Sequence, residues 1–316
     1  MSISNKDVFI LAPLQGLTDY EFRNAYSKIF PNSFEMAVTP FISLTHGNNE
    51  TSKKKYRDVL PENNKNNIKL IPQVLGNDEK GIIEVANGVY NLGYRELNIN
   101  LGCSVKRITR KTRGSALMKD TEELERILNK VCKASPCSIS LKLRLGYDIN
   151  EDIFRLIPII NSLPISSVII HPRLGIEDFS SQLDLDSFEK AYSLIKTKLV
   201  YNGEIRTKED FNKLKSRFPN INSWMIGRGV LNNPTLIEEI KSTKPTDKRK
   251  KIMDLSNELI NNSIRLNKLK EFWTYFSIGF GISPNDYKLL LESNSLEEFI
   301  EIINKLMEFD FEDEKE

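Results

Sequence analysis

Residues 68–103 read IKLIPQVLGNDEKGIIEVANGVYNLGYRELNINLGC and predict a strand, a helix and a second strand, in that order. The two ends are short apolar runs of strand length. Between them, residues 77–93 place apolar side chains along one helical face, begin with Asn77 or Asp78 as a cap, and end at Gly93. A crossover helix makes the strands it joins parallel, so the stretch predicts a βαβ unit.

The same alternation extends over the first 230 residues or so. A second crossover helix is predicted over 120–134, where Asp120 or Thr121 stands ahead of Glu123 as in a capping box. Short apolar, strand-like runs begin at Val8, Phe34, Ile68, Glu96, Cys137, Ser166, Lys198 and Ser223.

Eight βα units in about 240 residues predict an α/β fold of the (β/α)₈ TIM-barrel type. The alternative is a doubly wound open sheet, but such a sheet usually has fewer strands and a glycine fingerprint after the first strand. The residues at that place, LAPLQGLTD, contain no GxGxxG. After a polar, proline-containing linker over 242–251, the pattern is purely helical. We therefore expect a barrel domain over 1–243 and a small helical domain over 244–316.

Composition restricts the class of protein. The chain has 316 residues, 40% of them hydrophobic and 28% charged, and no window approaches the roughly 18 apolar residues of a membrane span. Residues 1–13 lack the pattern of a secretory signal, so we expect a cytoplasmic protein. Three cysteines without a CxxC pair and two histidines make a metal site unexpected.

The net charge is only +2, so affinity for nucleic acid would have to come from local clusters of cations. One such cluster follows a predicted strand directly, whereas clusters of this kind elsewhere are more typical of a solvated surface. It consists of Lys106, Arg107, Arg110, Lys111 and Arg113.

Sites in a barrel form at the carboxyl ends of the strands. In SISLKLRLG, Lys142 and Arg144 alternate with leucines, so they share one strand face and point into the barrel mouth, where an anion is expected to pair with them. The NGE of Asn202–Glu204 and the GRG that starts at Gly227 end the last two strands. Their glycine N–H groups and Arg228 favour a phosphorylated ligand.

Seven motifs taken in order resemble those of the tRNA-dihydrouridine synthases: LAPLQGLTDYEFR, IPQVLG, NINLGC, RGSALM, LKLRLG, VYNGEI and WMIGRGVLNNP. The helical part with KLKEFWTYF is similar to the bacterial branch called dihydrouridine synthase C. The resemblance implies an enzyme that reduces the C5–C6 double bond of a D-loop uridine in tRNA, with FMN as cofactor and NADPH as reductant. Uridine 16 is the target expected from the branch.

The resemblance also implies roles for residues at the strand ends. Pro13, Leu14 and Gln15 would border the flavin ring, Gln73 would hydrogen-bond its edge, and Lys142 and His171 would lie beside it. The ribityl phosphate end would be bound by Asn202, Gly203, Glu204, Gly227 and Arg228.

Cys103 matches the catalytic cysteine of the family. Once hydride has reached C6 of uracil, C5 needs a proton from the other face of the base. A thiol with an ordinary pKa near 8.5 is mostly protonated at neutral pH and suits this task, although nearby cations would lower that pKa. Cys132 and Cys137 are expected to be inert core residues.

For the substrate, Asn100 matches the asparagine that contacts base and flavin. Arg144, His171 and Arg173 are expected near the uracil carbonyls or a phosphate. A base swung out of tRNA needs its backbone held at the mouth, a task that fits the cation cluster. Lys268 and Lys270 would form a second RNA surface in a helical tRNA-binding domain. Trp273 and Tyr275 are further candidates for that surface, but for them core packing is the favoured interpretation.

Three positions depart from the family pattern. Ser104 replaces the usual proline after the cysteine, Pro172 interrupts His-Gly-Arg-Thr, and Pro40 replaces an acidic residue. These changes concern the substrate pocket more than the flavin.

Two other functions stay open: the same flavin chemistry on another RNA such as rRNA or on a small enoyl compound, and a non-catalytic tRNA-binding protein. The cations after Cys103 favour RNA, and the retention of Cys103, Lys142 and His171 favours an enzyme. We expect a monomer.

Overall fold

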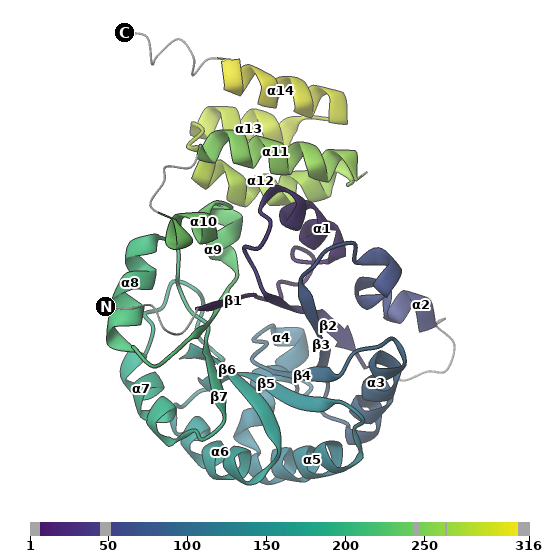
Figure 1. The fold of residues 1–316 in the computed structure, drawn as a ribbon, viewed down its shortest axis with the longest axis vertical. Helices are drawn as coiled ribbons and strands as arrows, with labels where there is room; N and C mark the ends of the chain where they lie inside the picture. The colour runs from purple at the N-terminus through teal and green to yellow at the C-terminus, as the bar shows by residue number, and fades with distance from the viewer. Residues whose placement is uncertain (1–6, 45–51, 243–246, 263, 309–316) are drawn as a thin grey trace.

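The computed structural model describes residues 7–44, 52–242, 247–262 and 264–308. Within these residues, eight parallel strands close into a barrel in chain order. The strands are β1 (Val8–Leu11), β2 (Met36–Ser43), β3 (Lys69–Leu75), β4 (Glu96–Leu101), β5 (Ser138–Gly146), β6 (Ile165–Leu174), β7 (Lys198–Tyr201) and β8 (Ser223–Ile226). The predicted barrel is confirmed, and the open doubly wound sheet is wrong (Figure 1).

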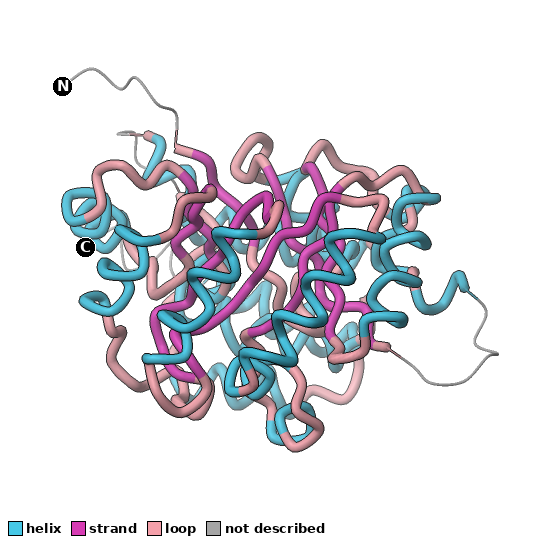
Figure 2. Tube along the Cα trace, turned by 90° about the horizontal axis from the view of Figure 1, so that it is seen from below, coloured by secondary structure: helices cyan, strands magenta, loops and turns pink. Residues whose placement is uncertain are grey.

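Helices cover the outside of the strands (Figure 2). The crossovers use α1 (Tyr20–Ile29), α3 (Glu79–Asn91), α5 (Thr121–Ala134), α6 (Glu151–Ser162), α7 (Leu185–Leu194) and α8 (Lys208–Arg217). Between β2 and β3, the described residues hold only the short α2 (Ser52–Lys55) and two 3₁₀ turns, Arg57–Val59 and Pro61–Asn63. Between β4 and β5 stand α4 (Lys106–Thr109) and a 3₁₀ turn, Gly114–Lys119, ahead of α5. The short α9 (Arg228–Asn232) and α10 (Leu236–Lys241) follow β8.

The two predicted helix starts are confirmed with one difference. Asp78 caps α3 by accepting a hydrogen bond from the Gly81 N–H (2.8 Å). Asp120 caps α5 in the same way, from the Glu123 N–H (3.0 Å). The Glu123 carboxylate binds Arg126 instead of turning back to the cap, so only half of the expected capping box forms.

The interior of the barrel has an apolar side and a polar side. Because side chains alternate along a strand, every second residue of each strand points inward. The apolar side is formed by Ile10, Ala12, Val38, Ile71, Ile169, Val200 and Met225. On the polar side, Gln73, Asn98 and Ser140 form a buried chain, in which Gln73 Nε2 donates to Asn98 Oδ1 (2.8 Å) and Asn98 Nδ2 donates to Ser140 Oγ (3.0 Å). This chain satisfies polar groups that would be costly to bury unpaired.

Pro40 explains an irregularity in β2. The register between β2 and β3 shifts between Val38 and Phe41. Pro40 has no N–H for the ladder, and the Gln73 N–H donates to the Thr39 hydroxyl (3.3 Å) beside it. The bulge directs Pro40 and Phe41 toward the mouth of the barrel, where both line the cavity described below.

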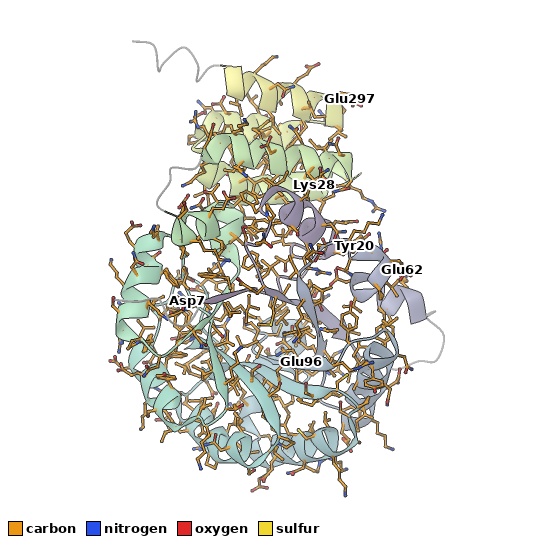
Figure 3. The ribbon with its side chains drawn as sticks, viewed as in Figure 1. Asp7, Tyr20, Lys28, Glu62, Glu96 and Glu297 are labelled. Carbon is orange, nitrogen blue, oxygen red and sulfur yellow. The ribbon has the colours of Figure 1, made fainter. Side chains whose placement is uncertain are left out.

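The C-terminal helices are α11 (Lys248–Asn261), α12 (Leu266–Phe280), α13 (Pro284–Glu292) and α14 (Leu296–Glu308), and they stack beside α1, α9 and α10 (Figure 1). Lys28 of α1 forms an ion pair with Glu258 of α11 (2.6 Å; Figure 3). Gly279 of α12 lies so close to the Asn232 carbonyl that any side chain would clash. Trp273 is fully buried and donates to Ser256 Oγ (3.0 Å), which confirms core packing.

The predicted linker is only partly described. Residues 243–246, and with them the predicted domain boundary, lie outside the described residues. Asp247 caps α11, so Lys248–Lys251 belong to the first turn of a helix and not to a linker. No helix in the described part of the chain is long and apolar enough to cross a membrane.

Candidate active site

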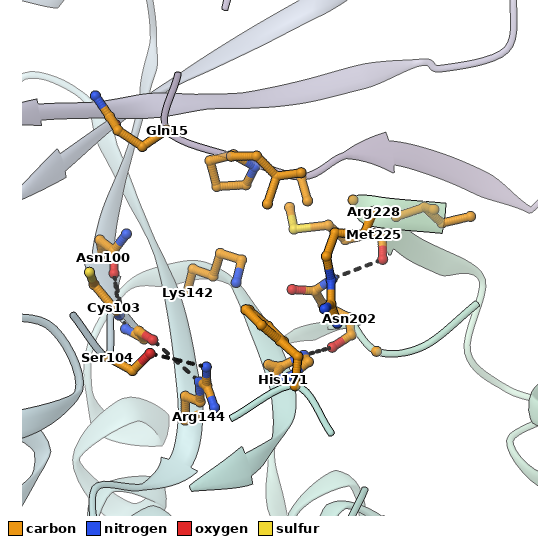
Figure 4. A pocket seen from close by; sticks show the side chains of 18 of the residues that line it. Gln15, Asn100, Cys103, Ser104, Lys142, Arg144, His171, Asn202, Met225 and Arg228 are labelled. Atoms are coloured by element: carbon orange, nitrogen blue, oxygen red, sulfur yellow. Dashed lines mark hydrogen bonds between the residues drawn. The ribbon is translucent and has the colours of Figure 1, made fainter. Parts of the chain in front are cut away.

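A cavity of about 390 Å³ opens at the carboxyl ends of the strands. Its lining comes from the carboxyl-terminal parts of β2, β4, β5, β6 and β8 and from the segments that follow β1, β4, β6, β7 and β8, as expected for a barrel. Of the sequence-predicted site residues, it includes Pro13, Leu14, Gln15, Asn100, Cys103, Arg107, Lys142, Arg144, His171, Asn202, Gly203, Glu204, Gly227 and Arg228. Figure 4 shows Cys103 on one side of the cavity, His171 and Asn202 on the other, and Lys142 between them.

Thr18 fixes the turn after β1. Its buried hydroxyl donates to the Ala12 carbonyl and accepts from the Leu14 N–H, both at 2.8 Å. This local closure holds Pro13, Leu14 and the exposed Gln15 at the edge of the cavity.

Asn100 holds the turn that carries Cys103. Its Oδ1 accepts from the N–H groups of Gly102 (3.0 Å) and Cys103 (2.9 Å), and its Nδ2 donates to Gln73 Oε1 (2.8 Å). The side chain of Asn100 therefore connects the buried chain in the barrel interior to the cysteine. Only its remaining N–H is free to meet a ligand.

The RGSALM motif, residues 113–118, also contacts the backbone of Cys103. Ser115 donates to the Cys103 carbonyl through both its N–H (3.0 Å) and its hydroxyl (2.9 Å). Gly114 has φ +60°, and a Cβ added there would lie 2.6 Å from the Cys103 carbonyl oxygen and 2.9 Å from its Cβ. The backbone of Cys103 is thus fixed, while the Cys103 thiol makes no hydrogen bond to any described residue.

Two cations project from β5, as the leucine alternation predicts. Burial, together with neighbouring Arg144, lowers the pKa of Lys142 to about 8, and no described residue bonds or pairs with its ammonium group. Arg144 is buried and donates to the carbonyls of Gly102 (3.3 Å), Leu174 (2.7 Å) and Glu177 (3.2 Å). Of the two β5 cations, Lys142 is therefore the one available to pair with a ligand.

His171 is neutral, and both of its ring nitrogens are occupied. Burial, followed by the charges of Lys142 and Arg144, holds its pKa well below the usual range. Nδ1 lies 2.6 Å from the Asn202 carbonyl, which can only accept, so Nδ1 carries the proton. Nε2 then accepts from Arg173 Nη1 (3.2 Å). His171 can pack against a ligand, but in this arrangement it has neither a free proton nor a free lone pair.

Glu204 binds three arginines near the ends of β6 to β8. Its Oε1 accepts from Arg173 (2.9 Å) and Arg228 (2.6 Å), and its Oε2 accepts from Arg206 (2.7 Å). Burial would raise the pKa of Glu204, but Arg173, Arg228 and Arg206 bring it below its ordinary value. One carboxylate for three guanidinium groups leaves this corner positive, and the N–H groups of nearby Gly203 and Gly227 have no acceptor among the described residues.

Two predicted ligand contacts lie behind the cavity wall. Gln73 is fully buried, and its amide is used by Asn98 and Asn100. Arg173 is 3% exposed and bonds Ser181, Phe179, Glu204 and His171. Neither lines the cavity, and in this structure both support their neighbours; direct contact with a ligand stays a prediction.

The cation cluster lies at the rim on and after α4. Lys106, Arg107, Arg110 and Lys111 are exposed, and their side chains bond to no described residue. Arg107 reaches the cavity. Arg113 instead donates to Asn77 Oδ1 (3.0 Å) and anchors the end of the segment to the loop before α3.

Lys268 and Lys270 are engaged within the protein. Lys268 pairs with Asp19, the cap of α1 (3.0 Å), and Lys270 donates to the carbonyls of Leu291 (2.7 Å) and Ser293 (2.5 Å) at the end of α13. Neither lines the cavity. Both side chains therefore stabilise helix ends and contacts within the protein, and a second RNA surface at these residues stays a prediction.

Sequence reasoning missed the loop after β6 and the apolar part of the wall. Phe179 is 47% exposed, and its ring lies 3.7 Å from the Arg228 guanidinium carbon and 5.7 Å from that of Arg144. Its one available signal was an aromatic residue in a polar loop. Other lining residues without a predicted role are Pro40, Phe41, Val105, Ile108, Arg206 and Met225.

The departures from the family pattern have identifiable positions. Ser104 lines the cavity, and its hydroxyl accepts from Arg144 Nη2 at 3.5 Å. Pro172 lies within β6, where its carbonyl accepts from the Asp184 N–H (2.9 Å). Pro40 forms the bulge in β2. Across the described residues, no group of three or more His, Cys, Asp or Glu side chains is arranged to hold a metal ion.

Comparison with known proteins identifies relatives of the chain. A family model described as dihydrouridine synthase (Dus) matches residues 10–293. A tRNA-dihydrouridine synthase B from Pasteurella multocida is 30% identical over 241 residues, which cover 75% of this chain and 70% of that protein. A tRNA-dihydrouridine(16) synthase from Vibrio vulnificus is 23% identical over 314 residues, 95% of this chain and 97% of that protein. Among solved structures, the old yellow enzyme from Trypanosoma cruzi superposes with a TM-score of 0.52 at 9% sequence identity. The match covers 87% of this chain and 94% of that one, and it shows that the two folds are alike.

The contact between Gly114 and Cys103 predicts a selective loss of turnover. In Gly114→Ala, the added methyl group must displace Cys103, and we expect turnover of the tRNA uridine to fall about tenfold to hundredfold. Gly93→Ala is the matched control, because Gly93 also has positive φ (+100°) but no atom within 4 Å of the added Cβ. Each variant should lose about 1 kcal/mol of unfolding free energy from the backbone alone. An equal loss of turnover in both would contradict the crowding at Cys103.

Lys142 predicts a pH dependence of stability in the protein freed of cofactor. The unfolded chain keeps the Lys142 proton up to the ordinary pKa of 10.5, whereas the folded chain releases it near 8. Between pH 8 and 10.5 the unfolded state binds more protons, so the stability of the wild type should rise with pH. Lys142→Met should be more stable at pH 7, on the order of 1–3 kcal/mol, and lack this rise.

Urea unfolding of both proteins across this pH range measures the difference between them. Lys196→Met, at an exposed lysine, is the control and should follow the wild type. Parallel stability curves for wild type and Lys142→Met would contradict an unpaired ammonium group with a lowered pKa.

Proposed function

The chain belongs to the dihydrouridine synthase family, and we propose that it reduces the C5–C6 double bond of a D-loop uridine in tRNA with a bound FMN. It is a flavin oxidoreductase of the tRNA-dihydrouridine synthase type. The observation that carries the proposal is the placement of one unbonded thiol, Cys103, across a barrel-mouth cavity from His171, with the unpaired cation Lys142 between them (Figure 4).

The residues of the cavity fit FMN. An anionic ring edge beside Lys142 would supply the partner that its ammonium group lacks within the protein. The N–H groups of Gly203 and Gly227 and the positive corner around Arg228 suit a phosphate. Bound there, reduced flavin supplies a hydride to C6 of uracil. NADPH as the reductant follows from the family resemblance and belongs to the same proposal.

The hydrogen bonds of Cys103 and His171 indicate which side chain donates the proton to C5 of uracil. When C6 receives hydride, C5 needs a proton, and the donor must carry one that is not already shared. His171 is excluded in this arrangement because its Nδ1 proton is donated to Asn202 and its Nε2 is occupied by Arg173. Cys103 has a thiol free to donate and a backbone held by Asn100 and Ser115. Cys103 is therefore the general acid in this proposal.

The substrate class follows from the charge at the rim. A small neutral substrate gains little from the exposed cations of the α4 segment, whereas the phosphates of RNA gain directly. For the target we propose uridine 16, in line with the resemblance to the dihydrouridine synthase C branch. Its support is the relative named for position 16 that aligns along nearly the whole chain. The B-type relatives align over a shorter part.

The direct test is reduction of tRNA by the purified protein. We expect flavin absorbance in the preparation and, with NADPH and unmodified tRNA, new dihydrouridine at position 16. Dihydrouridine at another D-loop position would overturn the target and keep the activity. No dihydrouridine in any tRNA, with or without reduction of rRNA, would refute the function. Localisation in the cytoplasm and a monomeric state stay predictions from the sequence.

Loss of the thiol separates binding from chemistry. In Cys103→Ala, we expect FMN and tRNA binding within about twofold of the wild type and turnover reduced by 10²-fold or more, the usual range for a general acid. Cys132→Ala, at a half-buried thiol on α5, is the control and should turn over normally. Unchanged turnover in Cys103→Ala would show that another group delivers the proton.

A further inference from the structure

The rim of the cavity beside Cys103 combines apolar and positive side chains. We call this segment the α4 rim; it consists of Val105, Lys106, Arg107, Ile108, Arg110 and Lys111. Val105, Arg107 and Ile108 line the cavity, and Lys106, Arg110 and Lys111 do not. The α4 rim thus turns two aliphatic side chains inward and carries its charge around them.

Val105 is unusually open for its position. It is 53% exposed, and Ile108 is half-buried. A single exposed valine is ordinary on a protein surface. This one stands two residues after Cys103, at the edge of the cavity, where an apolar side chain gains only if a ligand covers it.

The cations of the α4 rim are also without partners. Some exposed cations elsewhere on the barrel pair with carboxylates, as Lys28 does with Glu258 and Arg126 with Glu79. Within the described residues, the side chains of Lys106, Arg107, Arg110 and Lys111 have no such pair. The segment is therefore complementary to a polyanion that brings its own apolar surface.

A nucleotide has this combination, a base with an apolar face between two phosphates. If a target base is inserted next to Cys103, the nucleotides bonded to it must remain at the rim, because Lys142 lines the cavity and the chain of Gln73 and Asn98 is fully buried in the barrel interior. The opposite rim carries the arginines around Glu204, and its exposed ring, Phe179, is already packed against Arg228.

We propose that the α4 rim reads a nucleotide adjacent to the target uridine, with Val105 and Ile108 against its base and the four free cations on its phosphates. This inference rests on the proposed function for the nature of the substrate. It makes Val105 a determinant of which uridine is presented, through contact with a neighbour that is not itself modified.

The test is a double-mutant cycle that combines a substitution in the protein with a change in the tRNA. Val105→Ser removes the aliphatic contact and leaves every charge in place. With intact tRNA, we expect kcat/KM to fall about fivefold and the tRNA dissociation constant to rise by a similar factor, as for partial loss of a buried valine contact. With a tRNA that carries an abasic nucleotide beside the target, on one side or the other, Val105→Ser and wild type should become equal, since the partner of the contact is gone.

Three controls keep the result specific. Ile278→Ser changes an aliphatic residue that is 65% exposed on α12, away from the cavity, and should leave both quantities within twofold. Val105→Thr keeps the shape and should give a smaller loss in the same direction. Flavin content and melting temperature show that each variant is folded.

Equal kcat/KM and equal tRNA affinity for Val105→Ser and wild type on intact tRNA would overturn the inference. A loss that persists unchanged with both abasic tRNAs would also overturn it. Wild-type protein that forms no dihydrouridine would instead refute the proposed function, and the tRNA dissociation constants would still decide whether the α4 rim contacts a base.

Discussion

The mouth of this barrel holds more positive charge than its own carboxylates neutralise. Lys142 and Arg144 on β5 and Arg173 on β6 are all directed into the barrel. The Glu204 carboxylate accepts hydrogen bonds from Arg173 and from the neighbouring Arg206 and Arg228. Burial and the neighbouring cations make further positive charge unfavourable here, so the pKa of Lys142 is lowered and His171 is neutral. A buried charge of this kind is stable only with a partner, so the charge imbalance itself selects anionic ligands. Cofactor and RNA in the proposed function are both such ligands.

The sequence predicted the parts of the structure that depend on local periodicity. Short apolar runs identified all eight strands, and alternation with leucines placed Lys142 and Arg144 on one face, because strand geometry repeats every two residues. The family resemblance gave Gln73 and Arg173 as ligand contacts, and both side chains are buried in the structure. That resemblance carries no information on depth, however, and both lie behind the cavity wall because their partners, such as Asn98 and Ser181, come from other elements.

Loops without periodicity gave the weaker predictions. The partners of surface side chains on helices were not predicted either: Lys268 and Lys270 were expected at an RNA surface, but they bind Asp19 and two helix-end carbonyls that are 21 or more positions away in the chain. Phe179 stands in a loop whose course is set by Arg144 and Arg173, through their bonds to the carbonyls of Leu174 and Phe179. Such placements are decided by tertiary contacts, which no pattern in a single sequence encodes.

The two sides of the cavity differ in chemistry, and the departures from the family pattern are unequally divided between them. The side formed by β7 and β8 keeps the glycines and Arg228 that suit a phosphate. On the side formed by β2 and β4, Pro40 makes a bulge and Ser104 follows the cysteine. Asn100 and Ser115 hold the Cys103 backbone independently of both changes. Chemistry can therefore be retained while the wall facing the RNA varies, which is what a family that modifies different uridines with one reaction requires.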